Sequence, residues 1–113
     1  MKDKTRILWL SRHPPLNSQI KELKRIFGDI DLTIDPKPFS DARDIAKRAK
    51  DYDEIVVVAP LSVIRQLITL SIKPLWAEME RVDSNGEVYV NGRHYNFIRF
   101  RRIVDIKIVY EDL

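Results

Sequence analysis

Three consecutive polar residues, Ser11, Arg12 and His13, are the most concentrated group of side chains in this sequence that could carry out chemistry. A hydroxyl and a guanidinium are suited to binding a phosphate, and an imidazole can exchange a proton near neutral pH. We therefore predict an anion-binding loop at these residues. His13 and Ser11 are its candidate catalytic residues, although each could also be an ordinary residue of a surface loop.

Further candidate ligands follow from where helices are expected to begin. Asn17 and Ser62 each lie near a predicted helix start, where backbone N–H groups and a short polar side chain favour an anion. Arg65 lies one helical turn into the second of these helices. Taken singly, these residues could be plain helix caps and a surface charge. The full predicted ligand-binding set is Ser11, Arg12, His13, Asn17, Ser62 and Arg65.

Several kinds of site are disfavoured by what the sequence lacks. The loop after the first apolar run contains no glycine, so neither a dinucleotide fingerprint nor a Walker phosphate loop is present. There is no cysteine, which excludes thiolate chemistry, and the two histidines are too far apart to suggest a metal site. We therefore expect no cofactor and no metal.

The elements that must position these residues can be predicted from apolar patterns. Apolar runs at residues 7–10 and 55–59 indicate buried parallel strands, and the first run leads directly into the Ser11–His13 loop. Helical spacing and strand alternation fill the intervening segments. We predict a βαβαβαβ arrangement over residues 1–82, with helices expected at about 17–27, 41–50 and 61–72 and strands also at 30–35 and 75–82.

The last third of the sequence has a different pattern. Asn91-Gly92 is a strong hairpin signal, and alternating apolar residues from 98 to 110 predict a further strand or strand pair, with a bulge at Arg101-Arg102. We predict antiparallel strands over residues 83–113. The fold class is thus α/β, a three-layer Rossmann-like domain spanning residues 1–113. Its mostly parallel sheet is expected in an order near 2-1-3-4, extended by a C-terminal antiparallel hairpin.

Composition sets broad limits on the function. The chain has 113 residues, of which 44% are hydrophobic and 33% charged, and its net charge is only +3. No apolar run approaches the ~20 residues needed to cross a bilayer, and none resembles a signal peptide. We expect a cytoplasmic protein.

The arginines and the apolar residues of the last third leave several interpretations open. Arg93, Arg99, Arg101 and Arg102 are interleaved with aromatic residues, which could form a DNA- or RNA-binding surface. We favour the simpler interpretation, that they are solvated charges on one face of a twisted strand. The apolar face of the same strand could complete a dimer interface, and a non-catalytic regulatory subunit that binds only protein also fits.

Three segments together resemble a known protein type. They are ILWLSRHPPLNSQIKEL at residues 7–23, VVVAPLSVI at 56–64 and FIRFRRIV at 97–104. They are similar to small Rossmann-like CRISPR accessory proteins that bind or cleave cyclic oligoadenylate, the ring-nuclease type. Similar architecture also occurs in small α/β proteins of phages, archaeal viruses and plasmids whose roles are not assigned.

The resemblance implies a homodimer that binds one cyclic ligand across its two-fold axis. Cleavage would proceed by in-line attack of a ribose 2′-hydroxyl, without a metal. Ser11, Arg12 and His13 would match the first ligand loop, and Ser62 with Arg65 the second. No catalytic residue maps one-to-one, so a binder with cleavage and a binder without it both fit. The leading prediction is recognition of a phosphate-bearing nucleotide.

Overall fold

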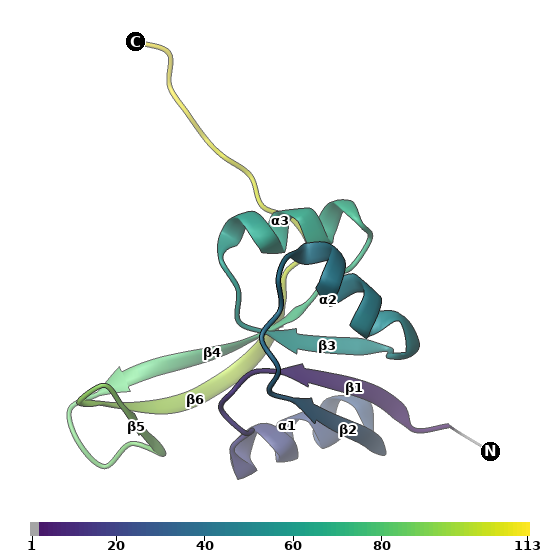
Figure 1. Ribbon diagram of the computed structural model, residues 1–113. Coiled ribbons are helices and arrows are strands. Elements are labelled where there is room, and N and C mark those ends of the chain that lie inside the picture. The colour runs from purple at the N-terminus through teal and green to yellow at the C-terminus, as the bar shows by residue number, and fades with distance from the viewer. Residues whose placement is uncertain (1–2) are drawn as a thin grey trace.

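Helices and strands alternate along the first two thirds of the chain, and antiparallel strands follow (Figure 1). The structure is a computed structural model that describes residues 3–113. The elements are β1 (Thr5–Leu10), α1 (Asn17–Phe27), β2 (Ile30–Asp35), α2 (Ala42–Arg48) with a 3-10 turn (Ala49–Asp51), β3 (Glu54–Val57), α3 (Leu61–Thr69), β4 (Leu75–Val82), β5 (Val88–Val90) and β6 (Arg93–Arg102).

All these strands belong to one mixed sheet in the order β2-β1-β3-β4-β6-β5. β1 lies between β2 and β3 and is parallel to both, and β3 meets β4 in parallel where Val56 lies opposite Leu75. β6 is antiparallel to both β4 and β5. An α/β fold with a mostly parallel sheet and C-terminal antiparallel strands is therefore confirmed. The full strand order differs from the predicted 2-1-3-4, because β6 and then β5 continue the same sheet.

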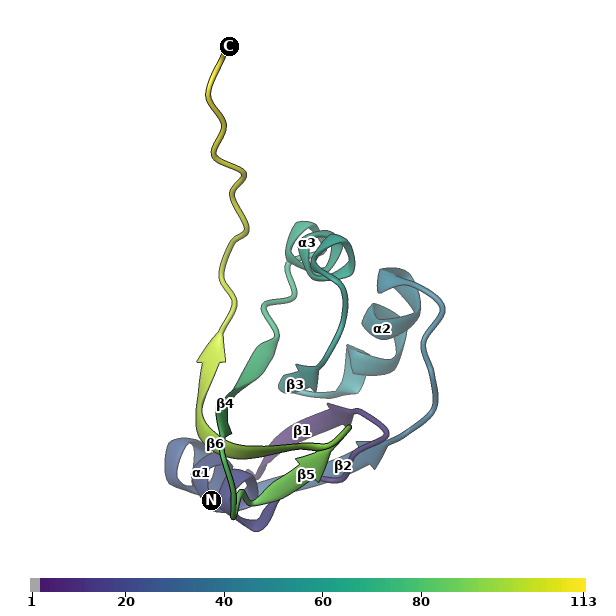
Figure 2. The same cartoon turned by 90° about the vertical axis from the view of Figure 1, so that its left-hand side faces the viewer.

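Helices cover both faces of the parallel part of the sheet (Figures 1 and 2). On one face, Ile7 and Trp9 pack with Leu23 of α1, which is fully buried. On the other face, Leu8 and Leu10 pack with side chains of α2 and α3. Successive residues of β1 therefore point into opposite cores, which explains why this strand is an unbroken apolar run.

The predicted end of the third helix differs from the structure. α3 ends at Thr69 rather than near residue 72, because Ser71 adopts a left-handed backbone (φ 65°) and the Ile72 N–H donates back to the Leu67 carbonyl. This hydrogen bond is the usual way for a chain to leave a helix. The α2 start is as predicted, since the Asp41 side chain caps it by accepting from the Asp44 N–H.

The predicted bulge and final strand also need correction. The register between β4 and β6 shifts at Glu78/Met79, where Ile98 is the extra residue, and no shift occurs at Arg101-Arg102. β6 is one continuous strand from Arg93 to Arg102. Residues 103–113 are extended but pair with no strand of the described chain, and they project away from the domain (Figure 2).

Candidate ligand-binding site

The loop after β1 is held in one conformation by hydrogen bonds from both of its ends. The indole Nε1–H of buried Trp9 donates to the His13 carbonyl oxygen at 2.9 Å, and the His13 N–H donates to Ser11 Oγ at 3.1 Å. Pro14 and Pro15 then restrict the backbone before α1 begins. Arg12 and His13 are exposed on this fixed loop, at the carboxyl edge of the parallel strands.

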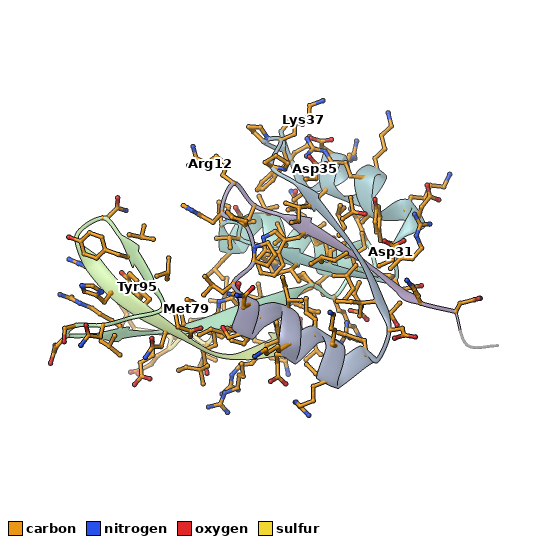
Figure 3. All side chains as sticks on the ribbon, turned by 90° about the horizontal axis from the view of Figure 1, so that it is seen from below. Arg12, Asp31, Asp35, Lys37, Met79 and Tyr95 are labelled. Carbon is orange, nitrogen blue, oxygen red and sulfur yellow. The ribbon has the colours of Figure 1, made fainter. Side chains whose placement is uncertain are left out.

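A basic cavity of about 490 Å³ opens beside this loop. One wall is the predicted trio Ser11, Arg12 and His13, and the opposite wall is the β2–α2 connection, which contributes Lys37. No carboxylate lines the cavity, and within residues 3–113 neither Arg12 nor Lys37 forms an ion pair. Figure 3 shows both side chains on the same side of the molecule. The cavity therefore presents two cationic groups whose charge is not matched by a bound acid.

The β2–α2 connection is positioned by Arg48 of α2. Its guanidinium donates to the carbonyl oxygens of Lys37 at 2.8 Å and of Pro38 at 2.5 Å, and it pairs with Asp44 at 3.0 Å. A weaker contact of 3.7 Å joins it to Asp35 at the end of β2. Arg48 thus fixes the backbone that presents Lys37, while the Lys37 ammonium remains free of these contacts.

The Asp44 carboxylate pairs with Arg48 and accepts a hydrogen bond from the Ser40 N–H, and these contacts stabilise its ionised form. A hydrogen bond from the Ser40 N–H is the main cause that lowers the pKa of Asp44, and Arg48 and Lys37 lower it further. The lowered pKa means that Asp44 stays ionised when the domain is folded. Asp44 does not line the cavity, so its negative charge lies outside it.

An apolar groove of about 320 Å³ adjoins the basic cavity. It forms because β4 and β6 extend beyond the end of β3, and β5 pairs with the extended part of β6. These three strands therefore face the carboxyl ends of β1 and β3 (Figure 1). Its walls include Trp9, Val58, Met79 and Tyr95, of which Figure 3 labels the last two. The groove and the basic cavity share Leu10, Ser11, His13 and Val58.

One buried polar side chain, Gln19, also lines the groove. It is only 5% exposed, and its Oε1 accepts from the Leu16 N–H at 2.8 Å, which secures the start of α1. Its Nε2 donates only a weak hydrogen bond, to Met79 Sδ at 3.7 Å, among the described residues. An amide has two N–H donors. Gln19 therefore keeps a donor for an acceptor atom of a bound molecule.

The structure brings together only part of the predicted ligand-binding set. Ser11, Arg12 and His13 line the basic cavity, whereas Asn17, Ser62 and Arg65 line neither it nor the groove. Asn17 and Ser62 do not cap their helices either, because Leu16 and Pro60 occupy the cap positions. The second histidine, His94, has a structural role in the β5–β6 hairpin, where its Nδ1 accepts a hydrogen bond from the Gly86 N–H at 3.3 Å.

Two further residues line the cavities but were not predicted from the sequence: Lys37 in the basic cavity and Gln19 in the groove. A signal for Lys37 was available, because a lysine that follows β2 must lie at the same sheet edge as the loop after β1. Gln19 had a weaker signal, as a polar residue one position from the apolar stripe of α1.

Three of the four arginines of the alternative nucleic-acid surface form ion pairs with carboxylates. Arg99 and Arg101 each place Nε 3.0 Å from the Glu78 carboxylate. Arg102 donates two hydrogen bonds of 2.8 Å to Glu54, which raise the pKa of its guanidinium. The Arg102–Glu54 pair lines a further cavity of about 670 Å³, at the opposite end of the parallel strands from the Ser11–His13 loop.

Comparison with protein-family models, with curated proteins and with solved structures finds no match to this chain. Within residues 3–113, no three His, Asp or Glu side chains cluster in a way that could hold a metal ion. None of the helices described is both long enough and apolar enough to pass through a bilayer.

Proposed function

We propose that the protein recognises a phosphate-bearing nucleotide in the two joined cavities at the carboxyl edge of its sheet. The phosphate lies in the basic cavity and the base in the apolar groove. The observation that carries this proposal is the junction itself: Ser11 and His13 line a cavity with two unmatched cations and, at the same time, a groove with apolar walls. A nucleotide has the same division into an anionic and a flat, largely apolar part.

The phosphate subsite is supported by charge and donor geometry. Arg12 can donate two parallel hydrogen bonds to phosphate oxygens, and Lys37 adds a second positive charge from the opposite wall. The Ser11 oxygen already accepts from the His13 N–H, so its hydroxyl hydrogen is available to donate to the ligand. These three potential donors come from two separate segments that line the same cavity.

The base subsite is supported by the composition of the groove. Met79 and Tyr95 offer polarisable and aromatic surface to a planar ring, and the remaining walls are largely aliphatic. The spare N–H of Gln19 is the polar group that can select an acceptor on the base edge. The combined volume falls within the ~300–1,000 Å³ typical of small-molecule sites.

Cyclic oligoadenylate is the specific ligand that the family resemblance favours within this class. Cleavage of such a ring would form a bond between a ribose 2′-oxygen and the phosphorus, and would break the bond from phosphorus to the 5′-oxygen. The products are a 2′,3′-cyclic phosphate and a 5′-hydroxyl, and one proton moves from the 2′-oxygen to the 5′-oxygen. His13 lies where the two cavities meet and is the candidate to move that proton.

The nucleic-acid alternative has less support from the geometry. Three of its four arginines, Arg99, Arg101 and Arg102, are already paired with carboxylates. Phosphate binding there would have to compete with Glu78 and Glu54, which would weaken the counterion release that drives such binding.

Titration calorimetry tests the proposal. The ligands are AMP, ATP, cyclic tetra-adenylate, cyclic hexa-adenylate, adenosine and inorganic phosphate. At least one nucleotide should bind more tightly than adenosine, and Arg12→Ala should weaken it at least about tenfold, or ~1.4 kcal/mol. Arg43→Ala removes an exposed arginine of α2 outside both cavities and is the matched control. Absence of heat with every nucleotide would refute the proposal, and product analysis of the same mixtures shows whether any ring is cleaved.

A further inference from the structure

Residues 103–113 form an extended arm that leaves the domain after β6 (Figures 1 and 2). Its first residues are anchored: the Ile103 N–H donates to the Pro74 carbonyl at 3.0 Å, and Ile103 and Ile106 pack against the core on the α2 and α3 face. Beyond them the arm is open to solvent, with Ile108 70% and Tyr110 82% exposed. We call these residues the C-terminal arm.

The sequence of the arm is that of a β-strand rather than of a linker. Apolar residues occupy positions 104, 106, 108 and 110, and Asp105 and Lys107 lie between them. Most of the apolar residues are β-branched, the type enriched in strands. An extended segment of this kind exposes a row of backbone donors and acceptors and gains stability only when another strand pairs with it.

The same chain carries an unpaired strand edge directly before the arm. On the side of β6 opposite β4, β5 pairs only with residues 93–95, and the Glu87 side chain accepts from the Phe97 N–H. Residues 98–102 have no strand on that side within the described chain. The arm does not fold back onto this edge of its own chain but projects away from it, and residues 98–104 contain none of the Gly, Pro, Asn, Asp or Ser residues that favour tight turns.

Charge on the open edge and on the arm is complementary. Arg99 and Arg101 share the single carboxylate of Glu78, so one positive charge on this edge is unmatched. Asp105 on the arm forms no ion pair within residues 3–113, and with Glu111 and Asp112 it outweighs the one positive charge of Lys107. A neighbouring arm would therefore supply the carboxylate that the open edge lacks.

We propose that a second copy of this chain covers the open edge, and that two copies exchange their C-terminal arms about a two-fold axis. Each arm lies antiparallel along residues 98–102 of the other copy. One alignment of the pleats places Phe100 beside apolar arm residues, and Arg99 and Arg101 on the same face as Asp105 of the second copy. Because the pairing is reciprocal, one contact between edge and arm is made twice and the assembly closes as a dimer.

Two neighbouring arm residues provide a matched test. Ile108 lies on the apolar face of the arm and Val109 on the charged face, and both are exposed, so neither substitution should affect folding of a single copy. Sedimentation equilibrium should show a dimer for the unmodified chain. Ile108→Lys should weaken the dimer at least about tenfold, and Val109→Lys should change it much less. Asp105→Arg should also weaken it, because it removes the carboxylate and adds a cation to the face that already carries Arg99, Arg101 and Lys107.

Hydrogen exchange distinguishes this dimer from others. The backbone amides of residues 104–109 should become protected as protein concentration rises, and Ile108→Lys should abolish that protection while its circular dichroism and thermal unfolding stay unchanged. A chain that remains monomeric to roughly 100 μM would overturn the inference. So would a dimer whose arm amides exchange freely at all concentrations. The result does not depend on nucleotide binding, since all samples lack ligand.

Discussion

The indole N–H of Trp9 donates a 2.9 Å hydrogen bond to the carbonyl oxygen of His13, and this contact ties the candidate site to the core. The Trp9 ring is 5% exposed and meets Phe100 of β6 edge to face at 6.3 Å. The loop that presents Arg12 is thus held by a side chain that is itself immobilised by packing. Preorganisation of this kind keeps the entropy cost of ligand binding low.

Trp9→Phe should loosen the loop without emptying the core. Phenylalanine keeps most of the apolar contact but cannot donate to the His13 carbonyl, so we expect a loss of about 1 kcal/mol in the free energy of unfolding, together with some cavity cost. Nucleotide affinity should fall as well. Urea denaturation and calorimetry measure the two effects. An unchanged affinity in a folded variant would show that the Trp9 contact does not position the site.

Gly86 and Gly28 should both resist substitution by alanine, for different reasons. A Cβ at Gly86 would lie 2.6 Å from the Tyr95 nitrogen and 2.8 Å from His94 Cβ, whereas a Cβ at Gly28 meets nothing within 4 Å. The cost at Gly28 comes instead from its positive φ of 77°, and is about 1 kcal/mol or more.

The two alanine variants can be separated by where they act. Gly86→Ala should displace the hairpin beside β5 and β6, and so disturb amide signals of Tyr95 and ligand binding in the groove. Gly28→Ala should lower the unfolding midpoint but leave both the hairpin signals and ligand affinity intact. If Gly86→Ala binds ligand normally, β5 is not needed as a wall of the groove.

Elements whose signals are local were predictable from the sequence. β1 and β3 follow from their apolar runs, and the hairpin follows from Asn91-Gly92, whose φ values of 52° and 75° are those that such a turn requires. The arm was not predictable in the same way. Alternation of apolar residues predicts a strand, but pairing depends on an available neighbour, and no segment of residues 3–113 supplies one.

The bulge and the site show a second limit. Arg102 breaks the apolar alternation because β6 ends there and its side chain turns to Glu54. The actual bulge lies opposite Glu78/Met79, where the apolar positions change from odd numbers to even numbers between Phe97 and Ile98. At the site, Ser11 to His13 were predictable because they are contiguous. Lys37 and Gln19 join them only through strand pairing and helix packing, which bring distant segments together.

Asp44 should make folding stability depend on pH in acid. Its pKa is lowered in the folded state, chiefly by the hydrogen bond from the Ser40 N–H. The ionised Asp44 therefore contributes fully to the free energy of unfolding above the unfolded pKa of about 4, and this contribution is lost as the pH falls through the folded pKa. Asp44→Asn should therefore be less stable than the unmodified chain at pH 7. The difference should shrink towards pH 2–3.

Chemical denaturation of both proteins at several pH values measures this difference. Asp31→Asn is the control, because Asp31 is an exposed carboxylate of β2 with no hydrogen-bonding partner in residues 3–113. It should change stability little at any pH. A constant gap between the unmodified chain and Asp44→Asn would mean that the Asp44 charge does not stabilise the α2 start.

Arg48 should act on ligand binding only through Lys37. Its guanidinium donates to the Lys37 and Pro38 carbonyls and does not line the basic cavity. Arg48→Met keeps much of the apolar stem but removes these donors and the Asp44 pair. We expect a stability loss of about 1–3 kcal/mol and a weaker nucleotide affinity, because the backbone that presents Lys37 becomes free to move.

A double-mutant cycle separates this positioning role from a general loss of folding. Lys37→Ala alone should weaken nucleotide binding with little loss of stability, since its ammonium forms no ion pair in the described structure and is the smallest of the influences that lower the pKa of Asp44. If Arg48 acts by placing Lys37, adding Arg48→Met to Lys37→Ala should reduce affinity little further, whereas the stability loss should persist in full. Additive losses of affinity in this pair would instead mean that Arg48 supports the cavity by a route other than Lys37. The reference pair is Arg12→Ala with Arg48→Met, whose losses of affinity are expected to be additive.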